Sequence, residues 1–460
     1  MRLYSPIALT IFHLCSMNKA ISGFSKLSKQ EKINWLVENF TQDPATAAQD
    51  LASWQHPDQQ VQRVLDGFTE NVVANYALPY CIAPNFLVNG HTYALPMVIE
   101  ESSVVAAASS AAKFWAERGG FHAEVVDTVK LGQVHFRWAG HGERLQSWFP
   151  MLKTRLIAES ADLTANMERR GGGIRSVELL DFTGLEPHYY QLRVAFETCD
   201  SMGANFVNSV LERFARSLEK FLMHHPGLSD LERDVEVIMA ILSNFTPDCR
   251  VRAWVECSID SFADLARNLG MEPHTLANRF ATAVRIAGID PYRATTHNKG
   301  IYNGIDAVVL ATGNDFRAVE ACGHTYASRN GQYRSLSRCR VEDGRFHFEL
   351  EVPMALGTVG GLTALHPLAR YSLELLGHPS ARELMCIVAC AGLAQNFAAV
   401  RSLVTTGIQQ GHMKMHLTNI LHHLAASEEE AAAAQFHFAK QTVSFSAVRT
   451  FLESMRIDGC

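Results

Sequence analysis

The chain lacks the sequence marks of the common nucleotide-binding and metal-binding folds. It has neither a GxGxxG nor a GxxxxGK[ST] run, so neither a Rossmann fingerprint nor a P-loop is present. Its ten cysteines are scattered without a CxxC pair, which argues against a zinc knuckle and a disulfide framework and favours a reduced protein. Lys and Arg form no basic run and the net charge is −6, so we expect neither nucleic acid nor an anionic membrane as a partner.

What is present is a globular chain with room for several domains. It has 460 residues, of which 47% are hydrophobic and 19% charged, and this predicts two to three domains with a large core. Near the start, Pro6–Leu14 is apolar and follows Arg2, as in a signal peptide, but no convincing cleavage pattern of small residues comes after it. We interpret residues 1–23 as a leader or a mis-started N-terminus and expect a cytoplasmic protein.

The hydrophobic pattern changes twice along the chain, which predicts an α+β fold with one module inserted into another. Residues 24–125 and 238–405 combine mainly helical patterns with short strands, as expected of one large domain. Residues 126–237 contain a helical stretch, the turn RRGGGI and the strand-like segments SVELLDF and YYQLRVAFETCD, which are typical of a small α+β module. We therefore expect the small module to interrupt a discontinuous large domain.

Two further helical regions are predicted towards the C-terminus. Leu384–Val404 is apolar and long enough to raise the question of a membrane span, but Gln395, Asn396 and Arg401 lie within it. Such polar groups favour a buried helix of the large domain, and we expect no membrane association. Residues 406–460 are helical in pattern and are interpreted as a mobile lid.

The densest group of polar residues is the run Arg293–Asp315, with the sequence RATTHNKGIYNGIDAVVLATGND. Basic, acidic and amide side chains stand there beside the apolar stripe AVVLA. A buried Lys299 among amides and carboxylates would make an electrophilic pocket that stabilises an oxyanion. The alternative is a polar surface loop followed by a buried strand, and the segment alone does not separate the two.

A second candidate is the segment DSMGAN, from Asp200 to Asn205, at a predicted strand-to-helix junction. A turn of small residues there would leave backbone N–H groups free to face a phosphate at the helix N-terminus. The alternative is an ordinary helix start with Asp200 as its N-cap.

Acids and histidines supply the remaining candidates. Glu100 and Glu101 stand between LPMVI and SSVVAAAS, where a carboxyl near a lysine and another carboxylate could serve as a proton donor. The alternative is that they only stabilise the first turn of a helix. His412 and His416 have an i, i+4 spacing compatible with a metal, but no acid separates them as in HExxH and no third ligand is near. A single catalytic histidine on a lid is the better interpretation, and we expect no metal.

In order along the chain, the motifs resemble the signature blocks of hydroxymethylglutaryl-CoA (HMG-CoA) reductase, specifically the soluble bacterial class II form. The matching blocks are ENVVANYALPY, VIEESSVVAAAS, DSMGAN, DPYRATTHNKGIYNGIDAVVLATGND, GLAQN and GIQQGHM. The resemblance runs from about Phe24 to the C-terminus. It implies a two-step, NAD(P)H-dependent interconversion of HMG-CoA with mevalonate and CoA, in isoprenoid metabolism.

The resemblance also implies an architecture. We expect a large, mainly helical substrate domain around a central buried helix, an inserted small ferredoxin-like cofactor domain, and a C-terminal helical flap. A homodimer or higher homo-oligomer is expected, with the active site at a subunit interface.

Four catalytic roles are implied by the matching motifs. Lys299 resembles the lysine that stabilises the developing oxyanion, and Glu101 the acid that protonates mevaldehyde during its reduction. Asp315 resembles the aspartate that hydrogen-bonds between those two, and His412 the flap histidine that protonates the CoA thiolate. Glu101 can donate a proton near neutrality only if desolvation and Asp315 raise its pKa against the pull of Lys299. The positions that match substrate-binding residues are Ser103, Asn244, Arg293 and Asn303.

The cofactor positions are carried over in the same way. Asp162 resembles an aspartate that meets the adenosine ribose in some family members, where a carboxylate favours NAD by repelling a 2′-phosphate; NAD and NADP both remain open. Two departures from the family pattern, Ala74 for glycine and Ser102 for proline, remove no catalytic group. The residues expected to bind the cofactor are Asp162, Asp200, Met202, Gly203, Ala204 and Asn205.

Two other functions are compatible with the same residues. In the first, the protein is a lyase in which Lys299 forms a Schiff base with a carbonyl substrate. In the second, it is a CoA-binding relative without catalytic activity, which the filled catalytic positions disfavour.

Overall fold

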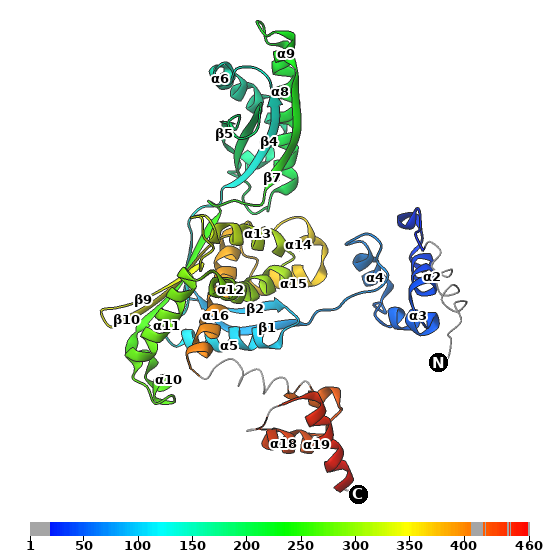
Figure 1. Ribbon diagram of the computed structural model, residues 1–460, viewed down its shortest axis with the longest axis vertical. Coiled ribbons are helices and arrows are strands. Elements are labelled where there is room, and N and C mark those ends of the chain that lie inside the picture. The colour runs from blue at the N-terminus through cyan, green and yellow to red at the C-terminus, as the bar shows by residue number, and fades with distance from the viewer. Residues whose placement is uncertain (1–18, 406–416, 419, 439–440, 442, 459–460) are drawn as a thin grey trace, which may run out of the picture. The chain divides into compact units, whose positions relative to one another are not determined.

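A computed structural model describes residues 19–405, 417–418, 420–438, 441 and 443–458. It contains helices and strands throughout, as predicted for an α+β fold (Figure 1). The chain divides into two compact units, Met1–Leu78 and Pro79–Cys460, which are described separately. Residues 1–18 of the predicted leader (residues 1–23) and the predicted flap histidine His412 lie outside the described residues.

The first unit is helical and its helices begin at defined caps. Ser28 and Glu31 form a reciprocal capping box at the start of α2, which satisfies two backbone donors at that end. Asp43 and Asp58 cap the two helices that follow. Its elements are η1 (Phe24–Lys26), α2 (Lys29–Phe40), α3 (Pro44–Ser53) and α4 (Gln59–Asp66).

The second unit contains two four-stranded antiparallel sheets and one hairpin. The hairpin pairs β1 (Tyr80–Val88) with β2 (His91–Val98) and leads into α5 (Ser102–Ala116). One four-stranded sheet has the order β3-β8-β10-β9. Its strands are β3 (His122–Val125), β8 (Arg250–Ser258), β9 (Ser337–Glu342) and β10 (Arg345–Pro353).

Two long helices, α12 and α16, lie side by side in the main hydrophobic core, beside the hairpin and the β3-β8-β10-β9 sheet (Figure 1). Of the described helices, α16 alone is long and apolar enough to cross a membrane, yet most of it is buried within the protein. This agrees with the predicted core helix. The helices around this core are η2 (Ile259–Phe262), α10 (Ala263–Arg267), α11 (Pro273–Ile289), α12 (Pro291–Ala311), α13 (Phe316–Ala327), α14 (Leu362–Leu365), α15 (Pro367–Leu375) and α16 (Ala381–Val404).

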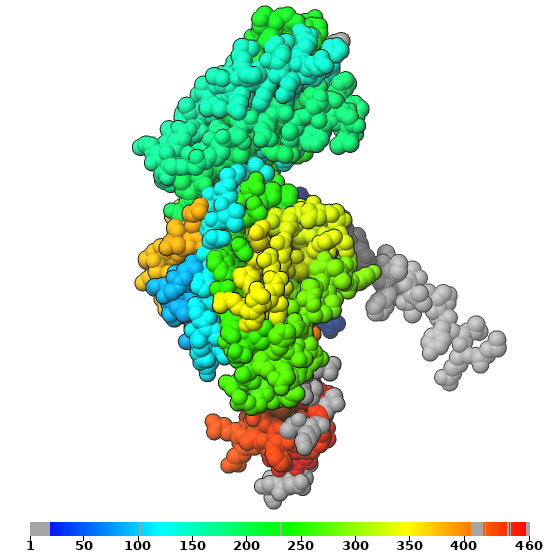
Figure 2. Space-filling view, turned by 90° about the vertical axis from the view of Figure 1, so that its left-hand side faces the viewer, coloured from blue at the N-terminus to red at the C-terminus, as the bar shows by residue number. Residues whose placement is uncertain are grey.

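The other four-stranded sheet has its own hydrophobic core and the order β5-β6-β4-β7. The strand-like segments found in the sequence form β5 and β6, and a helical layer packs against the sheet. Figure 2 shows the atoms of this part, coloured cyan to green, gathered in one continuous body. Its elements are β4 (Lys130–Trp138), α6 (Gly142–Ala158), α7 (Ala161–Glu168), β5 (Gly173–Asp181), β6 (Tyr189–Glu197), α8 (Ala204–His224), α9 (Asp230–Arg233) and β7 (Val235–Ser243).

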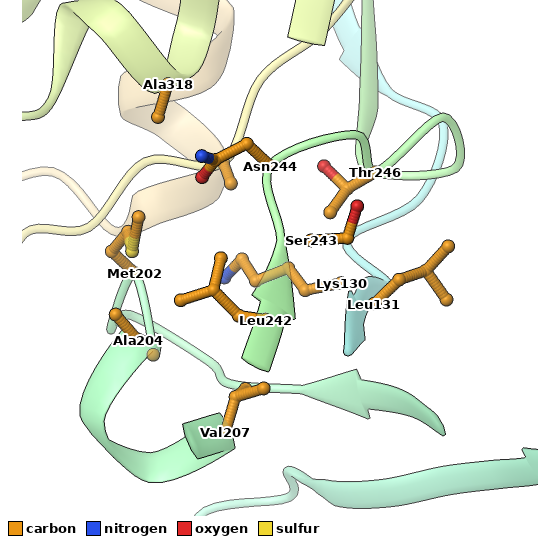
Figure 3. Close-up of a pocket in the computed structure, with 12 residues that line it drawn as sticks. Lys130, Leu131, Met202, Ala204, Val207, Leu242, Ser243, Asn244, Thr246 and Ala318 are labelled. Atoms are coloured by element: carbon orange, nitrogen blue, oxygen red, sulfur yellow. The ribbon is translucent and has the colours of Figure 1, made fainter. Parts of the chain in front are cut away.

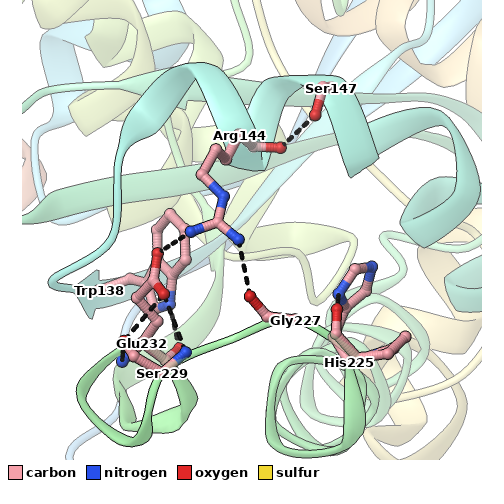
Figure 4. A network of polar contacts seen from close by, with 8 residues as sticks. Trp138, Arg144, Ser147, His225, Gly227, Ser229 and Glu232 are labelled. Carbon is pink, nitrogen blue, oxygen red and sulfur yellow. Dashed lines mark hydrogen bonds and ion pairs between the residues drawn. The ribbon is translucent and has the colours of Figure 1, made fainter.

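A polar network closes one end of this sheet (Figure 4). Arg144, in the first turn of α6, pairs with Glu232 of α9 and donates to the Gly227 carbonyl at 3.0 Å. The indole N–H of Trp138, at the end of β4, donates to the Glu232 backbone carbonyl at 2.6 Å. The network therefore ties α6, β4 and α9 together. Towards the C-terminus, α18 (Glu428–His437) and α19 (Phe445–Asp458) share a small apolar cluster of their own.

Candidate active site

The run Arg293–Asp315 is a helix and a tight turn, not a loop and a strand. Asp290 caps α12, and the helix continues to Ala311, so the AVVLA stripe, a buried strand in the alternative interpretation, is helical. Gly304 explains part of the pattern, because an added Cβ would lie 2.4 Å from the Ala391 carbonyl oxygen of α16. The glycine lets the two core helices approach closely, and the apolar stripe packs in the core.

The polar side chains of α12 point to different sides of the helix. His297 and Asn298 are buried and hydrogen-bond to Ser337 and to backbone around it. Lys299 and Asn303 stand one turn apart on another face, where Lys299 is exposed and Asn303 half-buried. The expectation of a buried Lys299 is therefore wrong for the single chain. Arg293 is half-buried in the first turn.

Asp306 lies about one turn further along α12, on the same face as Lys299 and Asn303. No catalytic or binding role was predicted for it. It is half-buried, and its Oδ1 has no hydrogen-bond partner among the described residues. Burial, followed by the neighbouring Glu320 carboxylate of α13, raises the pKa of Asp306 to about 8. The face that carries Lys299 thus also holds a carboxyl group that titrates near neutrality.

Asp315 stands at the N-cap of α13, where its carboxylate accepts from the backbone N–H groups of Arg317 and Ala318. Its two oxygens also bind the Arg317 guanidinium, at 3.0 and 2.9 Å. Burial raises the pKa of Asp315, but the Arg317 side chain and the backbone donors outweigh it and the net shift is downward. Within the described chain, no hydrogen bond joins this carboxylate to Lys299 or Glu101.

Glu101 and Ser103 meet at the start of α5. The Ser103 hydroxyl donates to Glu101 Oε1 at 2.8 Å. Glu101 occupies the N-cap position, yet its side chain makes no capping hydrogen bond. This disfavours the alternative in which the acid only stabilises the helix, and it brings a predicted proton donor next to a predicted substrate-binding hydroxyl.

Helix α15 contacts the hairpin that precedes Glu101 and the turn that precedes Asp315. The hydroxyls of Tyr80 in β1 and Ser372 in α15 share a hydrogen bond of 2.9 Å. A Cβ added at Gly313 would lie 3.0 Å from the Ala369 side chain of the same helix. The structure therefore brings the segments leading to Glu101 and Asp315 against one helix.

The segment DSMGAN lies at the start of α8, but Asp200 is not the cap of that helix. The N-cap is Gly203, which has a φ of 90° and makes no side-chain cap. Asp200 Oδ1 instead accepts from the backbone N–H of Ala381 at 2.8 Å, at the start of α16. The N-cap interpretation of Asp200 is therefore wrong, and α8 has no side-chain cap at its N-terminus.

A small cavity opens beside this uncapped end (Figure 3). Met202, Gly203 and Ala204 line it, together with Asn244 from the loop after β7. Predicted cofactor-binding and substrate-binding residues thus share one cavity. The structure adds Lys130, at the start of β4, which sequence reasoning missed because a lone lysine in a strand pattern carries no signal.

The other three cofactor candidates, Asp162, Asp200 and Asn205, do not line this cavity. Asp162 lies on a different helix from the turn before α8. It is exposed on α7 and binds the Arg213 guanidinium with both oxygens, at 3.1 and 3.3 Å. The hydrogen bond from Arg213 lowers the pKa of Asp162. Its negative charge is therefore already partly compensated. Among the described residues, no group of three or more His, Cys, Asp or Glu side chains could hold a metal.

Comparison with known proteins places this geometry in one family. Residues 29–417 match the family model of hydroxymethylglutaryl-coenzyme A reductase. The chain is 35% identical over 416 residues to the 3-hydroxy-3-methylglutaryl-coenzyme A reductase of Archaeoglobus fulgidus, covering 90% of this chain and 89% of the relative. A probable reductase of the same name from Borreliella burgdorferi is 32% identical over 422 residues, covering 88% and 89%.

Solved structures agree. A 3-hydroxy-3-methylglutaryl-coenzyme A reductase from Streptococcus pneumoniae matches with a TM-score of 0.69 and 36% identity, over 95% of this chain and 100% of that one. The class II enzyme from that organism, bound to NADPH in open conformations, matches with a TM-score of 0.68 and 37% identity, over 84% and 100%. These relatives mark the chain as an oxidoreductase. It belongs to the hydroxymethylglutaryl-CoA reductase family, in its class II form.

Proposed function

We propose that the chain interconverts HMG-CoA with mevalonate and CoA in two reductive steps, with NADH or NADPH as the reductant. The observation that carries this proposal is the Glu101–Ser103 pair at the start of α5, in a chain whose other described catalytic positions, Lys299 and Asp315, match the family. A bound nicotinamide cofactor would supply the hydride for each step.

The chain's own residues would then move protons and stabilise charge. Lys299 stabilises the negative charge that develops on the thioester carbonyl oxygen in the first reduction and on the aldehyde oxygen in the second. Glu101 donates the proton to the aldehyde oxygen in the second reduction, and Ser103, which contacts it, holds the acyl group. His412, outside the described residues, is proposed to protonate the departing CoA thiolate, because a histidine has a near-neutral pKa.

The spacing of Lys299 and Asp315 supports an active site built from two copies of the chain. From Lys299 to Val309 the helix rises about 15 Å, and the Asn314 backbone N–H bonds the Val309 carbonyl just before Asp315. That separation exceeds what the two side chains of one chain can span. If the lysine is to meet the aspartate, a second copy must supply one of them, so we propose a homodimer or higher homo-oligomer. A second copy would also cover the exposed Lys299.

The cavity beside α8 is proposed to receive part of the cofactor. Gly203 lets the turn before α8 pack closely against the end of β6, because an added Cβ would lie 2.5 Å from the Thr198 side chain. The uncapped N-terminus of α8 favours an anionic group. The relative bound to NADPH supports a nicotinamide cofactor. The Arg213 pairing of Asp162 weakens the case for discrimination against a 2′-phosphate, so we propose that both cofactors are accepted.

The domain arrangement is part of the proposal. We propose residues 24–125 and 238–405 as the substrate domain, 126–237 as the cofactor domain and 406–460 as the flap. The element order βαββαβ, with strand order β5-β6-β4-β7, supports a ferredoxin-like cofactor domain; its sheet extends to Ser243. We also propose a cytoplasmic location, which the burial of α16 supports.

The test is initial rates in both directions with NADH, NADPH, NAD⁺ and NADP⁺. The expected result is oxidation of reduced cofactor with HMG-CoA and reduction of oxidised cofactor with mevalonate plus CoA. Absence of turnover with every cofactor in both directions would overturn the proposal. The lyase alternative is not favoured, because a Schiff-base lysine is usually desolvated and Lys299 is exposed in the single chain.

A further inference from the structure

We propose that Lys130 is a further ligand-binding residue, whose ammonium group supplies the positive charge for an oxyanion bound in the cavity beside α8. The inference rests on the proposed function only for the identity of that oxyanion, which is a phosphate of the dinucleotide or the carboxylate of the acyl substrate. The burial of Lys130, its hydrogen bonds and its surroundings carry the argument.

Lys130 begins β4, and its side chain runs inward beneath the turn Asp200–Asn205 (Figure 3). The residue is 6% exposed. Its ammonium donates to the Thr198 hydroxyl and, at 2.9 Å, to the Ser201 carbonyl. An ammonium has three N–H donors, so the described partners leave one for a group bound in the cavity.

The charge of Lys130 has no counterion among the described residues. No carboxylate lies within ion-pair distance, 4.0 Å, of its ammonium. The two carboxylates that interact electrostatically with Lys130 are Glu197 and Asp200. Each already accepts other hydrogen bonds: Glu197 from the Thr128 hydroxyl and the Cys199 N–H, and Asp200 from the Ala381 N–H. A buried charge without a partner is costly, and burial accordingly lowers the pKa of Lys130.

The turn does not need Lys130 to hold its shape. The Thr198 hydroxyl donates to the Ser201 carbonyl at 2.6 Å, so the lysine's two acceptors also bond each other. The Gly203 N–H donates to Ser201 Oγ at 3.0 Å, and the Thr358 N–H donates to the Asp200 carbonyl at 2.8 Å. Since these bonds would remain without the lysine, its unpaired charge is better explained by a ligand.

The cavity supplies the rest of an oxyanion site. Besides Lys130 it is lined by Gly203 and Ala204, where the helix dipole of α8 adds positive potential. Asn244 contributes an amide from the opposite loop. A phosphate or carboxylate bound here would meet an ammonium, an amide and a helix N-terminus, and it would supply the missing negative charge.

The test compares the full-length wild-type protein with Lys130→Met, a neutral substitution of similar length. We expect roughly tenfold weaker binding of the oxyanion ligand, because a charge-assisted hydrogen bond is lost. We also expect an unliganded melting temperature that is unchanged or higher, because an unpaired buried charge is removed. A structural lysine would instead lower the melting temperature and leave the affinity of the folded protein unaltered, which would overturn the inference.

Three readouts identify the oxyanion. If Lys130→Met raises the Kd for NADPH and NADH, measured by titrating their fluorescence, the group that binds Lys130 is a phosphate of the cofactor. If the substitution raises only the KM for HMG-CoA, that group is the carboxylate of the acyl substrate. Inorganic pyrophosphate, measured by thermal shift, probes the site without turnover and should stabilise the wild type more than Lys130→Met. No difference in any of the three overturns the inference. If the wild type binds pyrophosphate but shows no turnover of HMG-CoA or mevalonate, the proposed function is wrong while the proposed oxyanion site at Lys130 is still supported.

Two control variants complete the design. Lys220 is exposed on the same module, so Lys220→Met removes the same net charge and should leave all affinities unchanged. Lys130→Arg keeps the charge and should retain much of the affinity lost in Lys130→Met. If Lys130→Met does not fold, Lys130→Gln replaces it as the neutral variant, and equal affinities of the Gln and Arg variants would contradict the inference.

Discussion

Lys130 and Lys299 occupy opposite environments in the same chain. Lys130 is buried against the turn before α8, with no counterion in the described part of the chain, whereas Lys299 is exposed on α12. Both are proposed to stabilise negative charge on a ligand. The difference indicates how each site is completed: the first needs an anion to enter an existing cavity, and the second needs another protein surface to exclude water. Desolvation strengthens the electrostatic interaction in both cases.

The largest effect is expected from Lys299→Ala. Removing the cation that stabilises the oxyanion should lower kcat by roughly 10²–10³-fold or more. Because Lys299 does not line the cavity beside α8, the Kd for NADPH should change little. Steady-state rates and cofactor titration check this, with Lys153→Ala on α6 as the control. Loss of turnover in this variant would exclude the non-catalytic CoA-binding alternative, whereas a variant that keeps normal turnover would contradict the role of Lys299.

Gly203→Ala should weaken the other site. Gly203 has a φ of 90°, and an added Cβ would lie 2.5 Å from Thr198. The strained backbone and the clash should cost about 1–3 kcal/mol and raise the Kd for NADPH. The matched control is Gly171→Ala, which has the same φ of 90° but nothing within 4 Å of the added Cβ. The control should lose stability while keeping its affinity for NADPH, and equal losses of affinity would contradict a role for the turn in binding.

A smaller effect concerns pH and the face of Lys299. The pKa of Asp306 is raised to about 8 by burial and by Glu320, so the folded chain holds a proton that the unfolded chain has lost. Stability should therefore fall as the pH rises towards 8, by about 1.4 kcal/mol per pH unit at most, and then level off. Asp306→Asn should flatten this slope. Urea unfolding between pH 6 and 9 measures it, and equal slopes in both proteins would refute the assignment.

The smallest effect is expected from Asp162→Ala. The Asp162–Arg213 pair is exposed, so its loss should change the stability of the fold very little. Because Asp162 lies outside the cavity beside α8, the ratio of kcat/KM for NADPH to that for NADH should shift by less than about threefold. A large shift towards NADPH would restore the sequence-based role of this carboxylate in selecting NAD.

The sequence predicted the α+β class and the buried helix α16 because long apolar patterns indicate local structure. It predicted the family because the motifs occur in the same order as in the family. It did not predict the conformation of AVVLA, since a short apolar run fits a strand or a buried helix equally well. The hydrogen bond from the Ala381 backbone N–H to Asp200 joins residues that are far apart along the chain. No local sequence pattern predicts such a contact. The burial of Lys130 was missed for the same reason.

The predicted site residues differ in how far apart they lie along the chain. Ser103 and Glu101 are neighbours in the sequence, so their contact follows from the local turn. Lys299 and Asp315 lie on one helix and the turn after it, and the rise of that helix keeps them apart within one chain. Their predicted interaction therefore stays a prediction about the assembly rather than about the fold.

The central claim, that Lys299 of one copy acts with Asp315 of another, is tested most directly by complementation. Lys299→Ala and Asp315→Asn each lack turnover alone, and the two variants are co-expressed so that mixed dimers form. A mixed dimer then holds one site with both groups intact, and a random mixture should recover about a quarter of wild-type activity. If the mixture stays as inactive as the separate variants, both groups act within one chain and the account is contradicted.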